Sequence, residues 1–261
     1  RLPKNGRPGR WMPKIKGDLG LCGTGYHICA GEHLLYWLGP AIWEVEWRGK
    51  SLSNREKVVV REARLLRRVT AWNERTAKLF AADCADRVLA YFELAFPREG
   101  RPREALDIAR RLAYGKATEL EVSVASETIW DLVVGALRGA CKEPNDVGPD
   151  IASLVSVAYA VRGPSERIRR SALPFINRVR FMAQSTWYGD VSMASVGACR
   201  AVAKGRGTIE LADVGTVVHD GLFVGAWTME HKWQVDRFLG YIEGRLPQVN
   251  GQDGITEQRS E

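Results

Sequence analysis

Two glutamates near residue 45 are the side chains whose type and spacing best suit acid–base chemistry. Glu44 and Glu46 belong to the stretch 42–47, in which acids alternate with tryptophan and valine as on a β-strand. Carboxylates two residues apart on one strand face lie roughly 7 Å from each other. Such a pair can protonate or attack a glycosidic carbon, and the same chemistry cleaves the bond between a base and its sugar. The alternative is two solvent-exposed acids without a catalytic role.

A third acid, Asp83, lies in an alanine-rich stretch with helical spacing of its apolar residues. A buried carboxylate is costly unless it is paired. The sequence therefore predicts either an ion pair with Arg103 or a pocket in which the pKa of Asp83 is shifted. With His27 added, the candidate catalytic residues are Glu44, Glu46, Asp83 and His27.

Four metal-capable side chains fall within twelve residues, with the spacing C-x4-H-x-C-x3-H. They are Cys22, His27, Cys29 and His33. Structural zinc sites usually combine a close Cys pair with a distant second pair, so a small core that contains a histidine and two thiols is the alternative. The sequence also lacks the GxGxxG, Walker, HExxH and GxSxG motifs. We therefore expect no cofactor and no bound metal, and these four residues are the candidates if zinc is present.

The chain is basic, with a net charge of +7 and a pI near 9.3. Lysine and arginine favour polyanions because binding to phosphates releases counterions. The nine tryptophans are either stacking platforms for bases or core anchors. The candidate nucleic-acid contacts are Arg7, Arg10, Lys14, Lys16, Arg101, Arg103, Arg167, Arg169 and Arg170. The alternative is that these cations are solvated or salt-bridged.

Spacing and breakers predict an α+β fold, with a small mixed α/β N-terminal unit packed on a larger, mostly α-helical domain. Residues 1–20, with six basic residues, three prolines and four glycines, predict a loop or an extended arm. Short strands are expected at 26–29, 42–47, 57–61 and 63–69, and a short helix at 32–38. Longer helices are expected at 73–96, 101–115, 120–137, 151–161, 165–180 and 228–243. The predicted division is 1–70, 71–246 and a polar tail at 247–261.

Part of the helical region resembles an immunity-protein-like family of bacterial polymorphic-toxin systems. The resemblance covers roughly residues 70–245 and is carried by RTA at 75–77, FAADCA at 80–85, VL at 88–89, RPR at 101–103 and WQVDRFL at 233–239. It implies an all-helical domain and a protein that blocks a toxin with its surface, without catalytic residues. Cys22, Gly25, His27 and Cys29 also resemble the C-x-x-G-x-H-x-C core of an uncharacterised N-terminal domain of bacterial and phage proteins. The order of strands there is similar to small ADP-ribosyltransferases, although no upstream His-Gly-Thr element is present.

Three functions follow as expectations. The first is a nucleic-acid-directed defence protein that cleaves an N-glycosidic bond in DNA, as a DNA glycosylase-type hydrolase does after flipping a base. The second is an immunity protein that neutralises a toxin by direct binding, and the third is an ADP-ribosyltransferase-like protein. The expected partners are DNA or another polyanion and a protein toxin. No apolar run reaches the roughly 20 residues of a membrane span, and five scattered cysteines favour reduced thiols, so we expect a cytoplasmic protein without a membrane partner.

Overall fold

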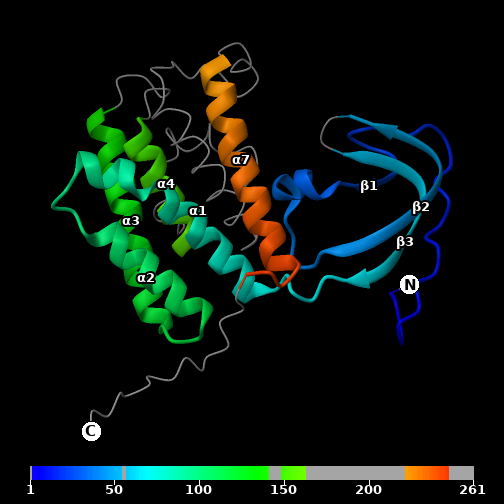
Figure 1. Ribbon diagram of the computed structural model, residues 1–261, viewed down its shortest axis with the longest axis horizontal. Coiled ribbons are helices and arrows are strands. Elements are labelled where there is room, and N and C mark those ends of the chain that lie inside the picture. Colours follow the sequence, from blue (N-terminus) through cyan, green and yellow to red (C-terminus); the bar gives the residue numbers. More distant parts are fainter. Residues whose placement is uncertain (1, 55–56, 141–147, 163–220, 247–261) are drawn as a thin grey trace, which may run out of the picture.

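The protein combines a small antiparallel sheet with a group of helices (Figure 1). The computed structural model describes residues 2–54, 57–140, 148–162 and 221–246. The N-terminal elements are β1 (Tyr26–Ile28), the 3-10 helix η1 (Gly31–Trp37), β2 (Trp43–Ser53) and β3 (Val58–Arg68). The helices that follow are α1 (Glu74–Ala95), α2 (Arg101–Ala113), α3 (Glu119–Ala140), α4 (Pro149–Val161) and α7 (Gly221–Ile242). This arrangement confirms the predicted α+β class.

The sheet has the order β1-β3-β2, and both pairings are antiparallel. We predicted two strands at 57–61 and 63–69, whereas the structure has one continuous strand, β3. Glu62, which separates the two predicted strands, lies directly opposite Arg48 of β2 and forms an ion pair with it. Because Arg48 on the neighbouring strand neutralises Glu62, this charge is compatible with a continuous strand.

The N-terminal arm is extended, as predicted, and it lies along β3. The backbone N–H groups of Gly9, Met12 and Ile15 donate to carbonyl oxygens of Leu65, Ala63 and Arg61 at 2.8, 2.9 and 3.0 Å. The numbering runs in opposite directions in the two segments. The arm therefore continues, antiparallel, the same edge of β3 that β1 occupies further along.

Helix α1 is the central element of the helical part, and it lies against α2, α4 and α7. Its start at Asn73 is confirmed: the Asn73 side chain accepts from the Thr76 N–H at 3.2 Å, while the Thr76 hydroxyl accepts from the Asn73 N–H at 3.0 Å. This reciprocal capping box satisfies two N–H groups that lack helical partners. The apolar stripe predicted for this helix is buried throughout except for the half-buried Tyr91.

One aromatic cluster joins the sheet end of the molecule to the helices. Trp72 is fully buried, and its indole packs edge-on against Phe80 and Phe238, with ring centroids 6.5 and 5.1 Å away. The Trp72 indole N–H donates to the Gly39 carbonyl at 2.9 Å, so its polar atom is satisfied across the junction. Leu35 of η1 belongs to the same hydrophobic core as these rings. Figure 1 shows α7 and η1 between the sheet and the other helices.

Some predictions fall outside the described residues, namely the helix at 165–180 and the tail at 247–261. The division at residues 70 and 71 stays a prediction. Among the described helices, none is both long enough and apolar enough to cross a membrane.

Candidate functional site

Each of the two strand glutamates is bound by an arginine on the neighbouring strand. Glu44 lies opposite Arg67 and accepts from its Nε at 2.7 Å and also from its Nη2. Glu46 lies opposite Arg64 and accepts from its Nε at 2.8 Å. The hydrogen bond and charge of Glu44 raise the pKa of Arg67. Both carboxylates therefore form cross-strand ion pairs between β2 and β3, and within the described part of the chain neither has a second side-chain partner.

The residues of the cysteine and histidine motif lie in β1 and in the segments that flank it. Gly25 has φ +136°, and a Cβ placed on it would lie 2.1 Å from Cγ1 of the fully buried Val59, so only glycine fits. The ring of His27 forms a hydrogen bond with the Leu21 carbonyl at 3.1 Å. Burial raises the pKa of the Cys29 thiol, against a smaller opposite effect of Lys57. In the described part of the chain, no three Cys, His, Asp or Glu side chains gather as a metal site would require.

Asp83 lies in a network between α1 and α7, and its partner differs from the one we predicted. Its Oδ2 accepts from Arg237 Nε at 2.8 Å and from the Tyr241 hydroxyl. The side chain of Asp83 is 15% exposed. Burial and the charge of Asp83 raise the pKa of Tyr241, so this hydroxyl stays protonated and remains a donor. The network fastens α7 to the central helix.

Arg103, the predicted partner of Asp83, instead binds Asp86 and Glu93. Arg103 Nε donates to Glu93 Oε1 at 2.9 Å, and its Nη1 contacts Asp86. Arg110 Nη2 donates to Asp86 at 2.8 Å and lies 3.6 Å from Asp83. For Arg110, burial lowers the pKa, but the hydrogen bond and charge of Asp86 outweigh it and raise the pKa overall. Asp83 and Asp86 are thus members of a charge-balanced network that joins α1, α2 and α7.

A second polar cluster between α1 and α7 had no counterpart among the sequence predictions. Glu230 is 1% exposed; its Oε2 accepts from Arg87 Nε at 2.7 Å, and its Oε1 accepts from Gln234 at 3.3 Å. The Arg87 guanidinium also lies 4.4 Å from the ring centroid of Trp233. A buried carboxylate needs such partners. The i, i+4 spacing of Glu230 and Gln234 could have indicated that the two side chains share one face of a helix. It could not have indicated Arg87, which is 143 residues from Glu230.

An apolar groove runs between α2 and α3. Its volume is about 430 Å³, and most of its lining is apolar, with a polar rim. Leu120 and Val124, one turn apart on α3, are 73% and 58% exposed along it. The lining residues are Arg101, Glu104, Ala105, Ile108, Leu120, Glu121, Val124, Ala125, Thr128 and Ile129. Leu120, Val124 and Thr128 repeat every four residues and so form a second stripe on α3, beside the buried stripe that contains Val122 and Ile129. Helical spacing in the sequence could have predicted this second stripe.

Comparison with known families gives one match. Residues 68–129 match the family described as Imm-5 like putative immunity protein. Comparisons with curated proteins and with solved structures found no match. The matched residues comprise the end of β3, all of α1 and α2 and the first half of α3. Every residue that lines the α2–α3 groove lies within them.

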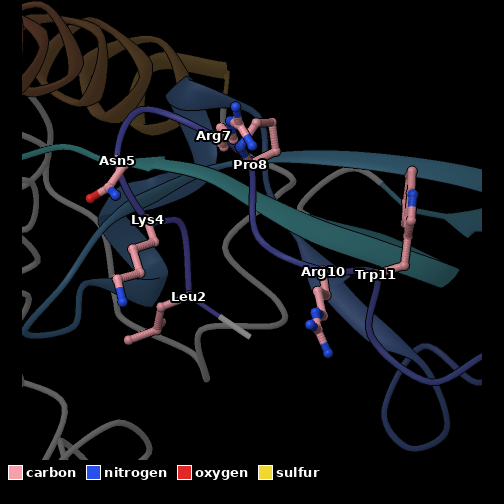
Figure 2. A pocket seen from close by; sticks show the side chains of 7 residues that line it. All are labelled: Leu2, Lys4, Asn5, Arg7, Pro8, Arg10 and Trp11. Carbon is pink, nitrogen blue, oxygen red and sulfur yellow. The ribbon is translucent and has the colours of Figure 1, made fainter.

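The basic residues predicted to contact nucleic acid fall into three groups. Arg101 and Arg103 are held by acids, since Arg101 Nε donates to Glu99 at 2.6 Å. Arg167, Arg169 and Arg170 lie outside the described residues. Lys14 contacts Glu62 at 3.8 Å, and Lys16 is exposed. Arg7 and Arg10 line an open hollow on the N-terminal arm, whose side chains Figure 2 shows.

Proposed function

We propose that this chain is an immunity protein that neutralises a protein toxin by direct binding. The observation that carries the proposal is the family match at residues 68–129, together with an exposed apolar groove formed entirely by those residues. Neutralisation by binding requires a complementary surface and no catalytic group.

The groove has the composition of a protein interface. Leu120 and Val124 are aliphatic side chains that lose contact with water when a partner covers them, and each contributes binding energy through its buried area. Arg101, Glu104 and Glu121 form a charged rim around them. The occupant we propose is an apolar segment of the toxin, with polar groups that meet this rim. Because an apolar contact is not screened by ions, the complex should persist at high salt.

The test is co-expression with toxin domains of bacterial polymorphic-toxin systems, with bacterial growth as the readout. Wild-type protein should restore growth and co-elute with the toxin in about 1 M salt, at which charge–charge attraction is screened within a few ångströms. Leu120→Glu combined with Val124→Glu should weaken the complex at least about 30-fold, as loss of a hot spot of ~2 kcal/mol does. Leu94→Glu is the matched control, since Leu94 is 85% exposed on α1 and does not line the groove.

Two results would contradict the proposal. One is a folded wild-type protein that neither binds the toxin nor restores growth. The other is full protection by the groove variant, which would place the contact elsewhere on the molecule.

Cleavage of an N-glycosidic bond stays a prediction. The three candidate carboxylates, Glu44, Glu46 and Asp83, each bind an arginine, so the observed contacts favour a structural role for them. Incubation with single- and double-stranded DNA, followed by alkali to cut abasic sites, tests it directly. Strand breaks that disappear in Glu44→Gln or Glu46→Gln would restore the enzyme hypothesis. ADP-ribosyl transfer likewise stays a prediction, and NAD binding tests it.

A further inference from the structure

The N-terminal arm begins with a tight turn that has a basic residue at each end. Lys4 and Arg7 exchange both backbone hydrogen bonds, at 3.2 and 3.0 Å. Between them, Asn5 and Gly6 have φ values of 51° and 73°. Positive φ at both central residues is the hallmark of a type I′ turn, for which Asn-Gly is the favoured sequence. The backbone of this turn is therefore well defined, and it holds the two basic residues directly opposite each other.

The turn is fixed to the rest of the molecule by the sheet. Gly9 is buried, and its N–H donates to the Leu65 carbonyl of β3 at 2.8 Å. Met12 makes the next such bond, at 2.9 Å to Ala63. These bonds leave little freedom in the segment between the turn and Trp11. The cations are thus presented from a supported edge of the sheet rather than from a free end.

Three cations line the open hollow beside this turn. The hollow has a volume of about 950 Å³ and is lined by Leu2, Lys4, Asn5, Arg7, Pro8, Arg10 and Trp11, without an acidic residue. Figure 2 shows these side chains spread along the arm. Within the described residues, the side chains of Lys4, Arg7 and Arg10 form no ion pair, in contrast to Arg48, Arg64 and Arg67 of β2 and β3.

The unpaired charges favour an anion. No acidic side chain lines the hollow, so a negative group bound there would be attracted by Lys4, Arg7 and Arg10 without competition from a neighbouring carboxylate. Trp11 lies at the end of the hollow, and the guanidinium carbons of Arg48 and Arg64 lie 4.2 and 4.8 Å from its ring centroid. Both of these arginines are neutralised by glutamates, so the unbalanced charge of the hollow belongs to Lys4, Arg7 and Arg10.

We infer that this hollow binds phosphate groups of a nucleic-acid backbone. A chain of phosphates fits better than a single one because Lys14 and Lys16 continue along the same arm and are exposed. From Gly9 to Ile15 the arm runs beside Leu65 to Arg61 of β3, four strand residues or roughly 13 Å, which is several phosphate spacings. Contacts to phosphates carry no base preference, so the binding is independent of sequence. The inference goes beyond toxin neutralisation and involves the sheet end of the molecule, away from the α2–α3 groove (Figure 1).

The test is fluorescence anisotropy with two labelled probes, a 20-nucleotide oligothymidylate and a 20-base-pair duplex of mixed sequence, over a salt series. The variant is Lys4→Ala/Arg7→Ala/Arg10→Ala. Each released counterion contributes about 0.7–0.9 to the slope of log affinity against log salt, so the slope should fall by about 2–3. The wild-type advantage should therefore shrink roughly 20- to 40-fold between 50 and 200 mM salt.

The matched control is Arg98→Ala/Lys116→Ala/Lys232→Ala, which removes the same charge from exposed positions in the helical part. It should change the slope by less than about 1, because these residues do not share a groove with the arm. A second variant, Gly6→Val, keeps all three cations but strains the turn at φ 73°. It should weaken binding several-fold while it leaves the total charge unchanged. Unaltered circular dichroism spectra establish that the variants fold.

Three outcomes would overturn the inference. The first is no binding of either probe by wild-type protein at 50 mM salt, and the second is equal loss in the arm variant and its control. The third is displacement of the probe by inorganic phosphate that equals, per phosphate group, its displacement by unlabelled oligonucleotide. That result would identify a small anion as the ligand. The growth assay separates this inference from the proposed function, because the arm variant should still neutralise the toxin.

Discussion

Replacing Asp83 with asparagine should lower the stability of the helical part, because Asp83 is the acceptor that holds α7 to α1. The substitution keeps the shape of the side chain and removes its charge. Arg237 donates from Nε to the carboxylate at 2.8 Å. An amide has one acceptor oxygen instead of two, so it cannot accept from every donor that now binds Asp83. Tyr241 competes for that same oxygen.

The expected loss is the net value of about one charge-assisted hydrogen bond. Such bonds contribute roughly 1.5–3 kcal/mol when they are buried. Arg237 is 33% exposed, so solvent screening reduces the effect, and we expect about 1–2 kcal/mol. For a chain of this size, each kcal/mol shifts Tm by about 2–4 °C. Asp83→Asn should therefore lower Tm by roughly 2–8 °C.

Thermal unfolding followed by circular dichroism measures this shift. Asp107→Asn is the matched control, because Asp107 is exposed on α2 and accepts no hydrogen bond within the described structure. The control should shift Tm by no more than about 1–2 °C, as surface substitutions do. If Asp83→Asn leaves Tm unchanged but abolishes a measured activity, the structural role argued here is wrong and Asp83 belongs to an active site.

Three further predictions concern the sheet and the start of α3. Gly25→Ala should cost roughly 2–4 kcal/mol in chemical denaturation, because the new Cβ meets Val59 at 2.1 Å and the φ of +136° disfavours alanine. Glu44→Gln should leave Tm nearly unchanged, since its partner Arg67 is 73% exposed, and a large loss of stability would contradict this. The Thr118 N–H, and after it Arg111, lower the pKa of Glu121 to about 2 from its ordinary value of 4.5. Its stabilising effect is therefore full above pH 4.5 and is lost as the pH falls towards 2, a loss that Glu121→Gln should not show in acid unfolding curves.

The local features of the fold were predictable from sequence because they depend on neighbouring residues. Asn73 with Thr76 determines the start of α1, and Pro102 lies in the first turn of α2 as expected. The spacing of apolar residues predicted the buried face of α1. The α+β class followed from an alternating strand pattern before residue 70 and helical spacing after it. Two local signals were missed: the Asn-Gly turn at residues 5 and 6, and the Thr118–Glu121 capping box that begins α3.

The partners of charged residues were not predictable, because they depend on how distant segments pack. Asp83 and Arg237 are 154 residues apart in sequence, and nothing in either segment distinguishes Arg237 from Arg103 as the partner. For Glu44 and Glu46, strand alternation predicted that the two acids share one face of the strand. It could not reveal that arginines of β3 lie opposite both. Cross-strand register, which decides this, depends on two bulges in the β2–β3 pairing.

The two surfaces proposed to bind ligands can be separated by ionic strength alone. The α2–α3 groove is apolar, and Leu120 and Val124 would contribute through area removed from water, which salt does not screen. The arm site would contribute through Lys4, Arg7 and Arg10, whose effect falls steeply as salt rises. A partner that binds through both surfaces would show an affinity with a salt-dependent part and a salt-independent part. The arm variant should remove the salt-dependent part, and the groove variant should remove the salt-independent part. If the arm variant leaves the salt slope of toxin binding unchanged, the arm takes no part in that complex and the groove alone binds the toxin.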